Sequence, residues 1–183
     1  MPQTFFIADL HIGHKNVIKY DGRPYFICSE MAEDIISKWN AKVKPRDTVY
    51  VVGDMFWTAQ DAQQYLPKFN GKIVLIEGNH DHNWESCYNH SKIVCVLPHY
   101  LGKIDKTWVY LSHQYTPFYL RHNKGIHIYG HSHNSQECLD EWYIQSILKE
   151  KGYTQECYNV GCMHPYMNYE PKTLEELRKE VKI

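Results

Sequence analysis

Short apolar runs rich in β-branched residues alternate along the chain with segments of helical periodicity. Short runs of this kind, bounded by polar or turn residues, are typical of buried strands, and their alternation with helices is typical of a layered α/β domain. Seven runs predict strands, at residues 4–8, 48–52, 72–77, 93–96, 107–111, 126–129 and 157–160.

Four segments between and after these runs predict helices. In the first, which we expect Ser29 to cap, one apolar stripe is formed by Met31, Ile35, Ile36, Trp39 and Val43. The second begins at Thr58, with Asp61 in its first turn, and ends near Pro67. The third carries apolar residues at helical spacing from Leu139 to Ile147 and closes at Gly152, and a capping box at Thr173 opens the last.

Composition narrows the class of protein. A chain of 183 residues with 43% hydrophobic residues is predicted to form a single domain over residues 1–183. The net charge of −1 gives no bulk attraction to nucleic acid or to an anionic membrane surface. No apolar run approaches the roughly 18 residues that span a bilayer, and no leader pattern follows Met1, so we expect a cytoplasmic protein. Its six cysteines form no CxxC pair and are expected to be reduced.

Residues that can bind metal ions follow five of the predicted strands directly. In chain order they are Asp9 and His11, Asp54, Asn79 with His80, His113, and His131 with His133. Ligands in layered α/β sheets bind at the carboxyl ends of strands, so we expect these side chains to share one rim.

The spacing and the residue types both favour a metal centre. The pairs Asp9-x-His11 and His131-x-His133 would each point to the same side of an extended backbone. Glycines at 53, 78 and 130 would let the backbone turn sharply at the rim. Oxygen and imidazole ligands without thiolates favour Mn, Fe, Zn, Ni or Co. Seven ligands suit two ions that share a carboxylate, the arrangement that activates water and polarises a phosphoryl group.

This ordered series of motifs resembles the calcineurin-like metallophosphoesterases. The motifs cover residues 9–133, and the short chain with Asn159-Val160-Gly161 near its end is similar to small bacterial and phage members. The resemblance implies an α/β fold, specifically a four-layer α/β/β/α sandwich in which two facing mixed sheets are flanked by helices.

The resemblance also implies roles for the motif residues. The first metal would be held by Asp9, His11, Asp54 and His133, and the second by Asp54, Asn79, His113 and His131. Asp54 would bridge two divalent ions, with manganese favoured. A metal-bridging hydroxide would attack phosphorus while His80, which would not be a ligand, protonates the leaving oxygen.

One departure from the larger phosphatases of that family concerns the substrate. Where they continue the Gly-Asp motif with a second Asp and then Arg-Gly, this chain has Gly53-Asp54-Met55-Phe56-Trp57-Thr58. The change leaves His80 without an evident orienting carboxylate and removes an arginine fork suited to phosphomonoesters. It favours a phosphodiesterase acting on a small-molecule phosphodiester or nucleotide. Nucleic acid is expected only as a substrate and not as a binding partner. A phosphomonoesterase or pyrophosphohydrolase and a noncatalytic metal-binding scaffold are the alternatives.

Candidate substrate contacts lie outside the ligand set. They are His14, Arg23, Trp57 and Arg121. Each could instead have no contact with substrate, as a surface residue or as part of a hydrophobic wall. His127 is predicted to be a structural histidine that faces away from Ile126 and Ile128. Residues 136–155 are compatible with a lid, a dimer contact or a surface helix.

Overall fold

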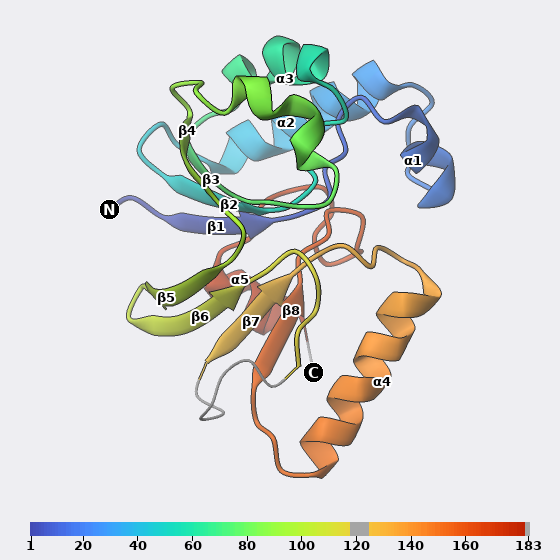
Figure 1. The fold of residues 1–183 in the computed structure, drawn as a ribbon, viewed down its shortest axis with the longest axis vertical. Helices are drawn as coiled ribbons and strands as arrows, with labels where there is room; N and C mark the ends of the chain where they lie inside the picture. Colours follow the sequence, from blue (N-terminus) through green and yellow to red (C-terminus); the bar gives the residue numbers. More distant parts are fainter. Residues whose placement is uncertain (118–124, 182–183) are drawn as a thin grey trace.

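Two four-stranded sheets stack on each other and helices flank them, as Figure 1 shows for the computed structural model. The structure describes residues 1–117 and 125–181. Apolar side chains of both sheets belong to one buried cluster, which includes Phe5, Val51, Leu75, Val109 and Ile128. The predicted α/β sandwich is therefore confirmed.

The first sheet has the strand order β1-β2-β3-β4, and all its described pairs are parallel. Its strands are β1 (Thr4–Ile7), β2 (Thr48–Val52), β3 (Lys72–Ile76) and β4 (Ile93–Leu97). The connections contain α1 (Lys15–Tyr20), α2 (Cys28–Lys42), α3 (Ala59–Tyr65), η1 (Leu66–Lys68) and η2 (Asp81–Cys87). The four strands run parallel because a helical crossover separates each strand from the next and returns the chain in the same direction. The mixed pairing that we expected in both sheets is limited here to an isolated antiparallel bridge between Phe6 on β1 and Lys172.

The second sheet, in the order β5-β6-β7-β8, is mixed. Its strands are β5 (Tyr100–Ile104), β6 (Thr107–Leu111), β7 (Ile126–Tyr129) and β8 (Glu156–Asn159), and only β5 and β6 are antiparallel. The sequence did not predict β5. Its two-residue turn is Asp105-Lys106, with φ of 47° and 69°, and this turn lacks the Asn-Gly signal typical of such hairpins.

All four predicted helices are present, with one corrected cap. Ser29 lies inside α2, whose N-cap is Ile27, and the Glu30 carboxylate accepts a hydrogen bond from the backbone N–H of Phe26 instead. Thr58 caps α3 through the N–H of Asp61, and Thr173 forms the predicted capping box of α5 (Leu174–Glu180).

Helix α4 (Gln136–Glu150) forms where predicted, but its large apolar residues do not face the core. Trp142 is 46% exposed and Tyr143 68%, whereas Cys138 and Glu141 are buried. No helix among the described residues is long and apolar enough to cross a membrane.

His127 on β7 is a buried, hydrogen-bonded residue, as predicted. Its Nε2 lies 2.9 Å from Ser112 Oγ, and its ring packs near the rings of Tyr110, Tyr115 and Tyr129. Burial lowers the pKa of His127 to about 3, so the side chain is neutral in the folded protein.

The His127 environment predicts an acid-dependent loss of stability. An unfolded histidine takes up a proton below about pH 6.5 while folded His127 does not, so each lower pH unit costs up to about 1.4 kcal/mol. The variant His127→Phe should escape this cost. Urea unfolding of both proteins at pH 7, 6 and 5 would measure their free energies of unfolding. As pH falls, the free energy of the variant should rise relative to that of the unaltered protein. A difference independent of pH would contradict the assignment.

Candidate metal centre

The structure brings together all seven side chains that the sequence proposes as metal ligands. They follow the carboxyl ends of five strands: Asp9 and His11 after β1, Asp54 after β2, Asn79 after β3, His113 after β6, and His131 and His133 after β7. Hence β1, β2 and β3 of the first sheet and β6 and β7 of the second all contribute to one site at the seam between the sheets.

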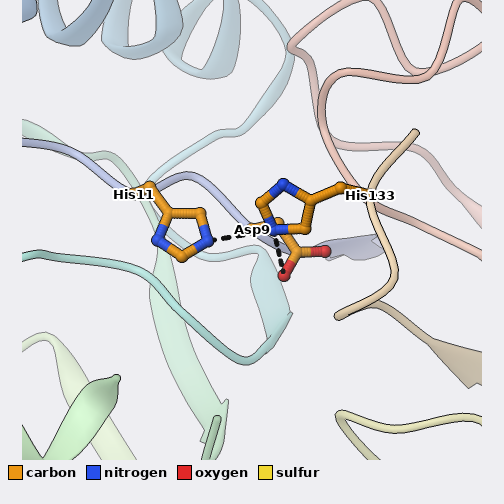
Figure 2. Close-up of side chains that lie close together, drawn as sticks. All are labelled: Asp9, His11 and His133. Atoms are coloured by element: carbon orange, nitrogen blue, oxygen red, sulfur yellow. Dashed lines mark hydrogen bonds and ion pairs between the residues drawn. The ribbon is translucent and has the colours of Figure 1, made fainter. Parts of the chain in front are cut away.

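One group of donor atoms forms around His11. Its Nε2 lies 3.1 Å from His133 Nε2 and 3.5 Å from Asp54 Oδ2, and His133 Nε2 lies 3.6 Å from Asp9 Oδ1. Figure 2 shows the side chains of Asp9, His11 and His133 pointing toward one another. These are the residues expected at the first metal.

A second group of donor atoms forms around His113. Its Nε2 lies 3.1 Å from Asn79 Oδ1, 3.2 Å from His131 Nδ1 and 3.4 Å from Asp54 Oδ2. Asn79 Oδ1 and His131 Nδ1 are 3.0 Å apart. Because Asp54 Oδ2 lies near both groups, a single carboxylate oxygen connects them, as expected for a bridging ligand.

The donor spacing fits divalent ions. Ligands bound at about 2.0–2.2 Å are separated by about 2.8–3.6 Å for octahedral to tetrahedral angles. The separations within both groups fall in that range. Asp9, Asp54 and His113 also converge within 4.8 Å, so the Asp9 carboxylate lies near both positions. Two imidazole nitrogens facing each other at 3.1 Å, as in His11 and His133, repel unless a cation or a proton lies between them.

Five of the seven residues have left-handed backbone conformations. The φ angles are 57° for Asp9, 49° for His11, 56° for Asp54, 72° for His131 and 49° for His133. Such conformations cost about 1–3 kcal/mol each for residues other than glycine and concentrate at functional sites. The expectation that the two Asp-x-His and His-x-His pairs are extended is therefore wrong, although their side chains do converge and Leu10 is fully buried between its neighbours.

Hydrogen bonds between loops hold these strained conformations. The N–H groups of Asp9 and His11 donate to the carbonyls of Gly53 and Asp54, and the N–H of His131 donates to the Asp9 carboxylate. Glycines provide the space: a Cβ on Gly53 would collide with the His113 ring.

Asp81 is a supporting residue that sequence reasoning missed. Its buried carboxylate accepts hydrogen bonds from the N–H groups of Asp54, Met55 and Gly78 and from Trp84 Nε1, at 2.8–2.9 Å. It thus fixes the loops after β2 and β3 against each other. The sequence shows Asp81 at the end of the motif Gly78-Asn79-His80-Asp81, but its backbone partners Asp54 and Met55 lie in another loop, so these contacts depend on the tertiary fold.

Asp54 and His113 form the electrostatic centre of the site. Burial acts to raise the pKa of Asp54, but the hydrogen bond from His113 and the charges of His113 and His11 hold it well below its usual range. Burial acts to lower the pKa of His113, but Asp54 and Asp9 outweigh it and raise this pKa to about 9. The site therefore holds a carboxylate that is ionised at neutral pH and placed to bind a cation.

Arg23 requires a correction. It was expected at the surface or at a substrate phosphate, yet it is 4% exposed and its guanidinium is fully engaged. It donates to Asp21 and to the backbone carbonyls of Asp9 and Leu10. Arg23 therefore supports the loop after β1. Arg121 lies outside the described residues.

His80, Trp57 and His14 line one side of the cluster. The backbone N–H of His80 donates to Asp54 Oδ1, and its ring centroid lies 5.1 Å from that of Trp57. His14 stacks on Trp57 at 3.8 Å, with the rings 7° from parallel. Within the described part of the chain, no carboxylate is hydrogen-bonded to the His80 ring.

A groove of about 440 Å³ adjoins the cluster. Its lining includes Asn79 and His113, two of the residues expected at the second metal. Its remaining described lining is Glu77, Gly78, Pro98, His99, Tyr110, Ser112, Gln114 and Thr116. The cluster thus adjoins both the stacked rings of Trp57 and His14 and an open groove.

The crowding at Gly53 predicts that Gly53→Ala weakens metal binding by at least about tenfold, because the methyl group would displace His113. Gly152→Ala is the matched control: its φ of 87° resembles the 93° of Gly53, but nothing lies within 4 Å of the added methyl group. Calorimetric titration of the metal-stripped proteins with Mn²⁺ would measure both affinities. Equal losses would mean that backbone strain alone, rather than the His113 collision, sets the effect.

Comparison with known proteins places this geometry in a family. The calcineurin-like phosphoesterase profile matches residues 3–180. The uncharacterized protein MJ1445 of Methanocaldococcus jannaschii is 30% identical over 186 residues, covering 98% of this chain and 91% of that protein. Gene 66 protein of Mycobacterium phage L5 is 31% identical over 85 residues, covering 44% of this chain and 41% of that protein.

Among solved structures, the protein of unknown function AQ665 from Aquifex aeolicus has the same fold. It superimposes with a TM-score of 0.73 at 23% sequence identity, covering 99% of this chain and 100% of that one. Because the family profile spans nearly the whole sequence and the metal-competent side chains converge, the chain belongs to the calcineurin-like phosphoesterase family and is a metal-dependent phosphoesterase.

Proposed function

We propose that this chain is a phosphodiesterase that acts on small phosphodiesters of the nucleotide type, with manganese as the favoured metal. The observation that carries the proposal is the groove beside Asn79 and His113, because a diester needs room for a second ester arm beside the phosphoryl group. Its volume falls within the usual range of small-ligand sites, about 300–1,000 Å³. A cytoplasmic setting, in which the six free thiols stay reduced, belongs to the same proposal.

The charges near the site also favour a diester. A phosphomonoester carries close to two negative charges at neutral pH and a diester carries one, so a monoester site benefits from an arginine fork. Among the described arginines, Arg23 is engaged with backbone carbonyls and Asp21, and Arg178 pairs with Glu156. Arg46 is an exposed residue in the turn before β2, away from the carboxyl ends of the strands.

The residues of the chain divide the chemistry between them. Two bound divalent ions would supply Lewis acidity and water activation for attack at phosphorus. Asp54 and the histidines of both sheets hold the reacting centre in place. His80, whose backbone is fixed by Asp54 Oδ1, donates a proton to the leaving oxygen. The stacked rings of Trp57 and His14 form the wall against which the leaving arm lies.

The first test is hydrolysis of bis(p-nitrophenyl) phosphate by metal-stripped protein, with and without added Mn²⁺. We expect turnover that requires the metal, is greater than turnover of p-nitrophenyl phosphate, and is lost in Asp54→Asn. Preference for the monoester would contradict the proposal and indicate a phosphomonoesterase. Two bound metals without turnover of any ester would indicate a scaffold.

The role of His80 predicts a dependence on the leaving group. General acid catalysis contributes about 10²–10⁴-fold when the leaving oxygen is basic. His80→Ala should therefore slow hydrolysis of a cyclic nucleotide, which releases a sugar hydroxyl, far more than that of bis(p-nitrophenyl) phosphate, which releases a stable phenolate. The exposed neighbour His82 provides the control variant His82→Ala. Equal losses on both substrates would argue against proton donation by His80.

The stacked wall predicts an effect on KM. Trp57→Ala removes the ring on which His14 stacks, so we expect a several-fold higher KM for nucleotide substrates while kcat changes less. The comparison variant Trp57→Phe keeps an aromatic face and should recover most of the loss. Steady-state kinetics on one nucleotide diester would measure both constants. A fall mainly in kcat, with KM nearly unchanged, would contradict the prediction.

A further inference from the structure

The buried ion pair of Asp21 and Arg23 connects His133 with the loop that carries Asp9. Asp21 Oδ1 lies 2.9 Å from His133 Nδ1, the ring nitrogen on the far side from the cluster, and Asp21 Oδ2 lies 2.8 Å from Arg23 Nε. Arg23 also donates to the backbone carbonyls of Asp9 and Leu10 at 2.9 and 2.8 Å. The side-chain exposures of Arg23 and Asp21 are 0% and 5%. One connected set of bonds therefore fixes both the loop after β1 and the His133 ring.

The second group has no comparable support from a charged residue among the described contacts. The outer nitrogen of His113, Nδ1, is 2.9 Å from the backbone carbonyl of Val52, which is a neutral acceptor. Asn79 is exposed and His131 partly buried, whereas Asp9 and His11 are 0% and 3% exposed; His113 is buried and His133 partly buried. The two metal positions thus differ in what supports the outer ring nitrogens of their histidines, a buried carboxylate at His133 and a backbone carbonyl at His113.

We propose that Asp21 is a positioning residue that makes the position formed by Asp9, His11 and His133 the tighter of two metal positions, so that it fills first. This proposal rests on the dinuclear centre of the proposed function but not on the identity of the substrate. Asp21 acts through His133 and touches no reacting atom.

Two physical effects support this order. A carboxylate that accepts from the outer N–H of a ligating histidine fixes the ring orientation and raises the basicity of the inner nitrogen, and loss of such a partner costs about 10–100-fold in metal affinity. Asp9 Oδ1 lies 3.6 Å from His133 Nε2 but reaches His113 only within 4.8 Å, so its charge lies nearer the first position. Asp54 is shared, and the second position has no carboxylate of its own among the described residues. A divalent cation is therefore attracted more strongly to the first position.

The test is calorimetric titration of the full-length, metal-stripped protein with Mn²⁺, which requires no turnover. For the unaltered protein we expect two binding steps of different affinity. Asp21→Asn, which keeps a neutral acceptor of the same size, should weaken the tight step by at least about 10-fold and leave the weak step nearly unchanged. Asn79→Ala is the matched variant and should weaken only the weak step.

Several outcomes would overturn the proposal. They are an unchanged tight step in Asp21→Asn, equal weakening of both steps in that variant, and loss of the tight step in Asn79→Ala. Melting of the metal-free proteins measures general stability: a large fall in the Tm of Asp21→Asn together with weakening of both steps would count against a positioning role, whereas an unchanged Tm with loss of the tight step alone supports it. Absence of phosphodiester turnover with two ordered binding steps would refute the proposed substrate class and leave this inference standing.

Discussion

The position of the Asp54 carboxylate is the constraint on which the rest of the site depends. One of its oxygens lies within 3.5 Å of ring nitrogens from both sheets, and the other accepts the backbone N–H of His80. That position is fixed from behind, because Asp81 binds the N–H groups of Asp54 and Met55. A left-handed backbone and a neighbouring glycine complete the arrangement. The fold therefore keeps Asp54 in an unfavourable left-handed backbone conformation, which places a single carboxylate oxygen between two groups of donors.

The seam between the sheets explains why a small protein can maintain such strain. His113 belongs to the second sheet, yet its outer nitrogen contacts the carbonyl of Val52 at the end of a strand in the first. Ala8 exchanges backbone hydrogen bonds with Val160 and Cys162 across the same seam. Bonds from the opposite sheet thus hold His113 and the end of β1 in place, and the strained residues beside them cannot relax independently of the core.

Sequence reasoning predicted the part of this structure that depends on local pattern. Strand positions, the apolar stripe of α2, the Thr58 and Thr173 caps and the convergence of the seven ligand side chains all follow from periodicity and from motifs at strand ends. Strand β5 was missed because its Asp105-Lys106 turn has no glycine signal. The buried roles of Arg23 and Asp81 were missed because their partners are backbone groups of remote loops, which the sequence does not reveal. Which side of α4 is exposed was left open, because helical spacing does not say which face is covered.

The long sequence separation within the site has a consequence for biosynthesis. His11 and His133, whose nitrogens lie 3.1 Å apart, are 122 residues apart in the chain, and the seam beside them is closed by residues 160 and 162. A ribosome that adds about 5–20 residues per second needs several seconds to pass from one histidine to the other. During that interval the nascent chain carries Asp9 and His11 without their partners. Metal capture at the complete site consequently requires that the chain be synthesised at least as far as residue 162.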